Sequence, residues 1–127
     1  MNQKKKNPLH QSFGYAVEGI FTGIKKERNM KIHCVIMILV VAAGLICEIS
    51  WIKWSLCLIL FGLILALELV NTAVEAVVDL VTEEKKPLAK LAKDTAAGAV
   101  LIAAIMAAIT GCIIFIPELV ELIERSF

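Results

Sequence analysis

Long apolar stretches bounded by charged residues dominate the pattern of this 127-residue chain. Residues 96–116 contain no charged side chain over 21 positions, enough helix to cross a hydrocarbon core of about 30 Å. Two shorter uncharged stretches, 34–47 and 54–67, reach that length only if polar residues at their ends also lie within the membrane. The pattern therefore predicts three transmembrane helices, at about residues 32–50, 54–81 and 95–116.

A further segment, ahead of the first span, is apolar on one side of a helix only. Phe13, Ile20 and Ile24 recur at helical spacing, opposite Glu18. The spacing predicts an amphipathic helix over residues 8–28 that lies on the cytoplasmic membrane surface with its lysines towards lipid phosphates. Packing of the same helix on the bundle for stability alone is the other interpretation, and the two are compatible.

Composition and charge support this assignment and add an orientation. Hydrophobic residues make up 59% of the chain, more apolar surface than a soluble globule of this size can hide. Of the 13 Lys and Arg residues, seven precede the first span, including the run 4–6, and four lie in residues 82–93; the others are Lys53 and Arg125. We expect a single-domain, all-α integral membrane protein (residues 1–127), multi-pass in a bacterial cell membrane, with its N-terminus cytoplasmic.

Four polar side chains interrupt the second predicted span, and all lie on one face of the helix. They are Glu68, Asn71, Glu75 and Asp79, whose spacing places them within roughly 80° of arc. A carboxylate within a bilayer costs about 2.5–3.5 kcal/mol, so chance placement is a poor explanation. At 1.5 Å per residue, Glu68 lies about 21 Å from the boundary tryptophan Trp54, in the cytoplasmic third of the membrane. Hard oxygen ligands in this arrangement predict a site for Mg²⁺ and an anionic ligand.

Lys93 and Asp94 come just before the third predicted span, on the same side of the membrane as this polar stripe. Lys93 can balance phosphate charge, and Asp94 can accept hydrogen bonds from a ligand. Asp94 can equally cap the start of the third span, and the stripe can instead form a structural network between helices. Both alternatives stay open at this stage.

Other motifs are missing from the chain. The glycines form neither a phosphate-binding loop nor a dinucleotide-binding turn, and His10 and His33 lie too far apart for a zinc motif. The four cysteines are isolated and are expected to pack as small apolar residues. Any nucleotide therefore needs a non-standard site, and we expect no nucleic-acid partner.

Small residues recur every four positions in the third span, at Ala99, Ala103, Ala107 and Gly111. Such a face lets helices approach closely and predicts a helix–helix contact. Because three helices can hardly enclose several carboxylates, we also expect the chain to form an oligomer.

The pattern Glu68-x-x-Asn71-x-x-x-Glu75-x-x-x-Asp79, followed by Ala92-Lys93-Asp94, resembles the prokaryotic diacylglycerol kinase family. The resemblance extends from Gly14-Tyr15 to the end of the third span. It implies a homotrimer of three-span subunits, each with an N-terminal surface helix and with sites shared between neighbouring subunits. It also implies ATP-dependent phosphorylation of a membrane lipid alcohol.

By position, the resemblance also implies roles for individual residues. Glu27 and Glu75 match the metal-binding carboxylates, and Asn71 matches an amide that helps to hold metal and phosphate. Glu68 matches the candidate general base beside the lipid hydroxyl. The residues that match nucleotide-binding positions are Lys93 and Asp94, with Asp79 as a supporting acid.

The segment 27–33, Glu-Arg-Asn-Met-Lys-Ile-His, resembles the Gram-positive branch of the family, whose members look like undecaprenol kinases. The resemblance thus implies an ATP- and Mg²⁺-dependent undecaprenol kinase, with diacylglycerol as the alternative acceptor. Two interpretations from other classes stay open. One is a small cation-conducting oligomer with acids lining a pore, and the other is a structural membrane subunit with a buried polar seam.

Overall fold

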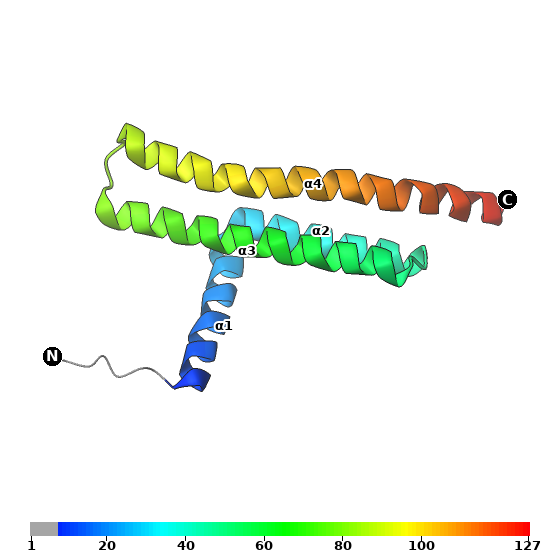
Figure 1. Cartoon of the computed structure of the whole chain (residues 1–127), viewed down its shortest axis with the longest axis horizontal. Helices are drawn as coiled ribbons and strands as arrows, with labels where there is room; N and C mark the ends of the chain where they lie inside the picture. Colours follow the sequence, from blue (N-terminus) through cyan, green and yellow to red (C-terminus); the bar gives the residue numbers. More distant parts are fainter. Residues whose placement is uncertain (1–7) are drawn as a thin grey trace.

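The computed structural model describes residues 8–127, so the lysine run at 4–6 lies outside the described residues. Its four helices are, in chain order, α1 (Leu9–Lys26), α2 (Arg28–Ile46), α3 (Trp51–Val81) and α4 (Pro87–Ser126). Helices α2, α3 and α4 run alongside one another, whereas α1 projects away from them (Figure 1). Helix α3 packs against each of the other three and is the centre of the subunit.

The three expected spans are confirmed as three long apolar helices, α2, α3 and α4, and the protein is an all-α, multi-pass membrane protein. Their bounds differ from the predicted ones. Helix α2 begins four residues before the predicted span, while α4 extends well past the predicted 95–116 at both ends. At 1.5 Å per residue α3 and α4 are about 46 and 60 Å long, so both project beyond a core of about 30 Å.

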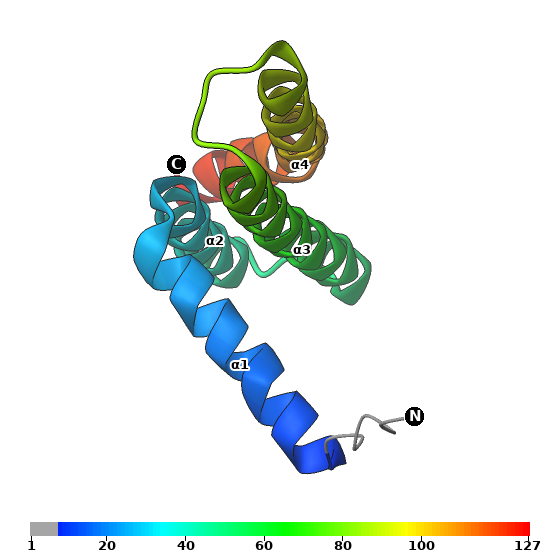
Figure 2. The same cartoon turned by 90° about the vertical axis from the view of Figure 1, so that its left-hand side faces the viewer.

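The predicted surface helix ends earlier than expected, at Lys26, because Glu27 has an extended backbone (φ −87°, ψ 122°). The chain changes direction there and α2 starts at the next residue, which leaves α1 directed away from the bundle (Figure 2). Gly23, in the last turn of α1, is buried beside Leu69 of α3. The end of α1 therefore packs on the bundle, while apolar side chains farther out, such as Phe13, are exposed. Contact of that exposed part with lipid stays a prediction.

Helices α2 and α3 are joined by a tight turn in which Glu48 has a positive φ of 51°. Close packing occurs just before this turn, where a Cβ atom on Gly44 would lie 2.7 Å from Cη2 of Trp54. This distance is too short for two carbon atoms that are not bonded to each other. The indole ring is rigid, so it cannot move aside as the end of a flexible aliphatic side chain can. Gly44 thus permits Trp54 to pack across α2, next to the buried cluster of Ile49, Cys57 and Ile114.

Gly44→Ala is expected to lower the free energy of unfolding by about 1–3 kcal/mol, since the added methyl group overpacks this contact. Thermal unfolding of the detergent-solubilised protein would measure the change. Gly62→Ala is the matched control, because a Cβ atom on Gly62 has no neighbour within 4 Å. Equal destabilisation by both substitutions would contradict the packing role of Gly44.

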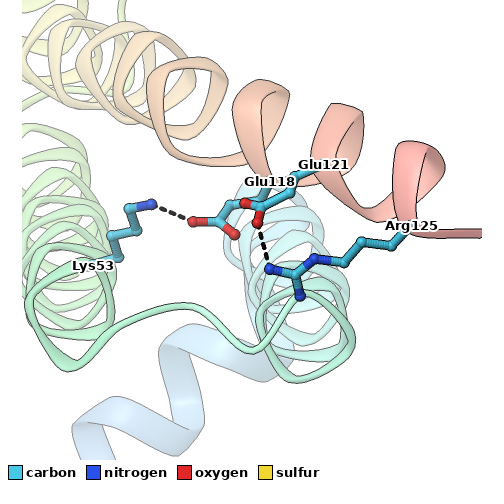
Figure 3. Close-up of polar contacts among 4 residues, drawn as sticks. All are labelled: Lys53, Glu118, Glu121 and Arg125. Carbon is cyan, nitrogen blue, oxygen red and sulfur yellow. Dashed lines mark hydrogen bonds and ion pairs between the residues drawn. The ribbon is translucent and has the colours of Figure 1, made fainter.

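At the end of the bundle away from the polar stripe, α4 continues through Pro117 to Ser126 instead of ending near Ile116 as predicted. Figure 3 shows an ion pair between Lys53, near the start of α3, and Glu118, and a second one between Glu121 and Arg125. The pair of Lys53 and Glu118 holds α4 against α3 directly after the proline. The local pattern alone could not predict this contact between helices.

Candidate active site

The polar stripe of α3 runs from the interior of the bundle to its exposed end, as the spacing predicted. Glu68 and Asn71 are buried, with 1% and 7% of their surfaces exposed. Glu75 is half-buried, and Asp79 is exposed. The four side chains therefore connect a site enclosed by helices with one open to solvent.

Glu68 is one of the two largest side chains that are fully buried. Its Oε1 atom has no hydrogen-bond partner among the described residues, although Nε2 of His33 lies 3.3 Å away. The distance is within hydrogen-bond range, but the two groups do not form a hydrogen bond in the structure. An unpaired buried polar atom costs about 1–3 kcal/mol, more if charged, so this oxygen is an acceptor open to a ligand.

Asn71 and Glu75 form a second polar group one turn along α3. Nδ2 of Asn71 donates to Oε1 of Glu75 over 3.1 Å, whereas Oδ1 of Asn71 is buried and has no partner within residues 8–127. Glu27, half-buried at the junction of α1 and α2, lies close enough to influence Glu68 electrostatically, as does Glu75. The oxygen atoms of these side chains fit the chemistry of Mg²⁺.

The protein ligands do not by themselves surround a metal ion. In the part of the chain that the structure describes, no three His, Cys, Asp or Glu side chains form a metal-sized cluster. Mg²⁺ commonly binds one or two carboxylates and completes its shell with water and substrate phosphates, so two carboxylates and an amide are sufficient. The metal roles of Glu27 and Glu75 stay a prediction.

Lys93 and Asp79 link α4 to the exposed end of the stripe. Nζ of Lys93 donates a hydrogen bond to Oδ1 of Asp79 over 2.6 Å, which raises the pKa of Lys93 above its ordinary value. Lys93 precedes the uncharged stretch of α4, at the solvent end of the bundle. A raised lysine pKa contributes to stability below the unfolded-state pKa and loses that contribution only as the pH rises through the folded-state pKa. Lys93 is therefore cationic at physiological pH.

Asp94 does not cap the helix, so that interpretation was wrong. Helix α4 begins at Pro87, seven residues earlier, because the proline fits the first helical position and its missing N–H costs nothing there. Asp94 instead pairs with Lys90 on the same helix.

A hollow of about 740 Å³ lies beside these pairs, between the end of α3 and the start of α4. Four lysines and several carboxylates line it. The lysines come from the connection and the first turns of α4, and an equal number of carboxylates in the lining balances their charge. The lysines are Lys85, Lys86, Lys90 and Lys93.

An apolar cavity of about 240 Å³ lies between α2, α3 and α4. His33 forms part of its wall, as does Ile64, one turn before Glu68. The small-residue face of α4 contributes Ala107 and Gly111. The predicted helix contact of that face is confirmed at Ala103, which is 3% exposed, but Ala99 is exposed.

His33 lies in the candidate site but is not among the residues that the sequence predicts for it, because its spacing from His10 excludes a zinc motif and no other motif includes it. The sequence nevertheless contains a signal for His33. Placing an ionisable side chain within a membrane helix costs free energy, as it does for the acids of the polar stripe.

Comparisons with known proteins assign this chain to a family. The sequence profile of the family described as prokaryotic diacylglycerol kinase matches residues 14–115. The chain is 42% identical over 113 residues to the undecaprenol kinase of Bacillus subtilis, covering 89% of this chain and 92% of that protein. It is 41% identical over 112 residues to the diacylglycerol kinase of Synechocystis, covering 87% of this chain and 64% of the relative.

A more distant relative has the same family name. The diacylglycerol kinase of Escherichia coli is 34% identical over 101 residues, covering 80% of this chain and 83% of that protein. The profile match includes the whole polar stripe and both Lys93 and Asp94. The chain belongs to the prokaryotic diacylglycerol kinase family of membrane lipid kinases.

Proposed function

We propose that this kinase transfers the γ-phosphoryl group of ATP to the hydroxyl group of undecaprenol. The observation that carries the proposal is the buried carboxylate of Glu68, which lies 3.3 Å from His33, a wall residue of an apolar cavity between α2, α3 and α4. A base in this position suits an alcohol with a long apolar chain better than a water-soluble acceptor. The similarity to the undecaprenol kinase of Bacillus subtilis supports the choice of lipid.

In the proposed reaction, Glu68 accepts the proton of the lipid hydroxyl as its oxygen attacks the γ-phosphorus of ATP. The new oxygen–phosphorus bond forms while the bond to the bridging oxygen breaks, and ADP leaves with that electron pair. Glu68 then releases the proton to water before the next turnover. Lys93 binds the nucleotide phosphates, with Asp79 and Asp94 fixing the lysines around them.

Glu75, Glu27 and Asn71 are the residues that would hold Mg²⁺. When bound, the ion neutralises phosphate charge and reduces repulsion of the incoming oxygen. The unpaired Oδ1 of Asn71 supports this assignment, because a buried amide oxygen without a donor is available as a ligand. The hydrogen bond from Asn71 to Glu75 orients both side chains.

Diacylglycerol is the second candidate acceptor. The Synechocystis relative, named a diacylglycerol kinase, is almost as similar in identity as the Bacillus protein, although this chain covers less of its length. A cation-conducting oligomer and a purely structural subunit have weaker support, since neither accounts for membership of a kinase family.

The deciding experiment offers undecaprenol and diacylglycerol separately to the purified protein in bilayers, with labelled ATP and Mg²⁺. Preferential labelling of undecaprenol is the expected result. Preferential labelling of diacylglycerol would show that diacylglycerol is the acceptor and would leave the proposed kinase site unchanged. If neither lipid were labelled, the proposed reaction would be wrong.

Lys93→Met is expected to raise the KM for ATP about tenfold and to change the KM for lipid little, because a charge-assisted phosphate contact is lost. Steady-state kinetics with varied ATP would measure it. Lys25→Met, an exposed change on α1, is the control. An unchanged KM for ATP would remove Lys93 from the nucleotide site.

We also propose a homotrimer with its N-terminus in the cytoplasm. Large apolar side chains are exposed along all three spans, among them Ile38, Leu58 and Ile102, and lipid or neighbouring subunits must cover them. Native mass spectrometry of the detergent complex tests the subunit number, and labelling of a cysteine introduced near the N-terminus in intact cells tests the orientation.

A further inference from the structure

Among the described residues, Glu68 has one ionisable neighbour that is not a carboxylate. The charged or ionisable groups that act on it electrostatically within residues 8–127 are His33, Glu27 and Glu75. Two of these are carboxylates, so the imidazole of His33 is the group that can donate a proton to a hydrogen bond. A buried carboxylate without such a donor is strongly disfavoured.

The fold holds His33 against Glu68 from two directions. Met30, three residues before His33 on α2, is 1% exposed, and its Cε lies near the close approach of Gly23 and Leu69. The last turn of α1 thereby fixes the first turns of α2 against α3. Beyond His33, the same face of α2 lines the apolar cavity. The imidazole thus lines the cavity and also lies within hydrogen-bond distance of the carboxylate.

The separation of the two groups is already that of a hydrogen bond. Nε2 of His33 is 3.3 Å from Oε1 of Glu68, and the exposed fraction of the His33 side chain is only 16%. The hydrogen bond itself is not formed among the described residues, so it requires the ring N–H to turn towards Oε1.

We propose that His33 is a positioning residue of this kinase. Its Nε2–H donates a hydrogen bond to Oε1 of Glu68 and holds the carboxylate where it receives the proton of the lipid hydroxyl. The inference rests on the proposed role of Glu68 as the base. It assigns His33 no contact with the reacting atoms and no proton transfer of its own.

Three substitutions at His33 test this geometry. The amide nitrogen of glutamine can reach the position of Nε2, that of asparagine reaches only the position of Nδ1, and leucine has no donor. His33→Gln is expected to retain activity within about threefold, whereas His33→Asn and His33→Leu lower kcat roughly 10–100-fold with less effect on the KM for lipid. Ile38→Leu, on the exposed side of α2, is the control.

A double-mutant cycle identifies the group through which His33 acts. In a Glu68→Gln background, His33→Leu is expected to have little further effect on the residual rate. A loss of the same factor in both backgrounds would overturn the proposal, as would equal activity of the Gln and Asn variants. If His33→Leu did not assemble, the Gln and Asn pair would decide.

A spectroscopic measurement separates this inference from the choice of substrate. The chain has two histidines, so His10→Gln leaves His33 as the single imidazole. Its ¹⁵N resonances in bilayers are expected to show a protonated Nε2 and to shift on Glu68→Gln. If the ¹⁵N resonances did not shift on Glu68→Gln, the pairing of His33 with Glu68 would be overturned even if undecaprenol were phosphorylated. A shift with no lipid labelled would retain the pairing and reject only the proposed function.

Discussion

Glu68→Gln is expected to lower kcat by about 10²–10⁴-fold, the usual cost of removing a general base. Glutamine has almost the same shape and can still accept a hydrogen bond from His33, but it cannot take up the proton of the lipid hydroxyl. Single-turnover labelling of lipid with ATP and Mg²⁺ would measure the chemical step directly.

The same change should leave stability equal or higher, because a neutral amide is cheaper to bury than a carboxylate with an unpaired oxygen. Loss of activity without loss of thermal stability distinguishes a chemical role from a structural one. Glu124→Gln, an exposed carboxylate at the far end of α4, is the matched control. Near-wild-type turnover by a correctly assembled Glu68→Gln variant would exclude Glu68 as the base.

Glu75→Ala is expected to raise the Mg²⁺ concentration needed for half-maximal activity by about 10–100-fold or more, since a carboxylate ligand is lost. The substitution also removes the acceptor of the Asn71 amide, so the remaining amide ligand loses its orientation. Activity measured against free Mg²⁺ at fixed ATP gives the shift.

Asn71→Ala serves as the second arm of this experiment, because it removes the buried Oδ1 atom and leaves the Glu75 carboxylate in place. A smaller shift in the same direction is expected from it. Glu124→Ala is the surface control. A Mg²⁺ requirement that is unchanged by Glu75→Ala would show the metal assignment to be wrong.

Much of the site was predictable because its residues lie on one helix. The spacing of Glu68, Asn71, Glu75 and Asp79 places them on one face whatever the rest of the chain does. Counting residues inward from Trp54 predicts their depth in the membrane, while the structure shows that burial within the bundle decreases from Glu68 to Asp79. Periodicity is a local property, so a single sequence is sufficient to read it.

Contacts between helices were less predictable. The pairing of Lys93 with Asp79 depends on where the connection between α3 and α4 places the start of α4. The packing of His33 on Glu68 depends on the rotation of α2 about its own axis. The start of the uncharged stretch next to Asp94 suggests a helix cap there, but Pro87 starts the helix two turns earlier. Hydropathy locates the membrane core and does not mark where a helix extending into water begins.

By itself, the sequence determined the three apolar spans, the family pattern and the single polar face of α3. Uninterrupted apolar length and helical spacing act within one segment and need no partner. Only the tertiary structure decided that Glu27 breaks α1 from α2, that α4 continues past Pro117, and that His33 lies against Glu68 and lines an apolar cavity. These features depend on helix rotation and close approach, which side chains distant in sequence fix together when they pack.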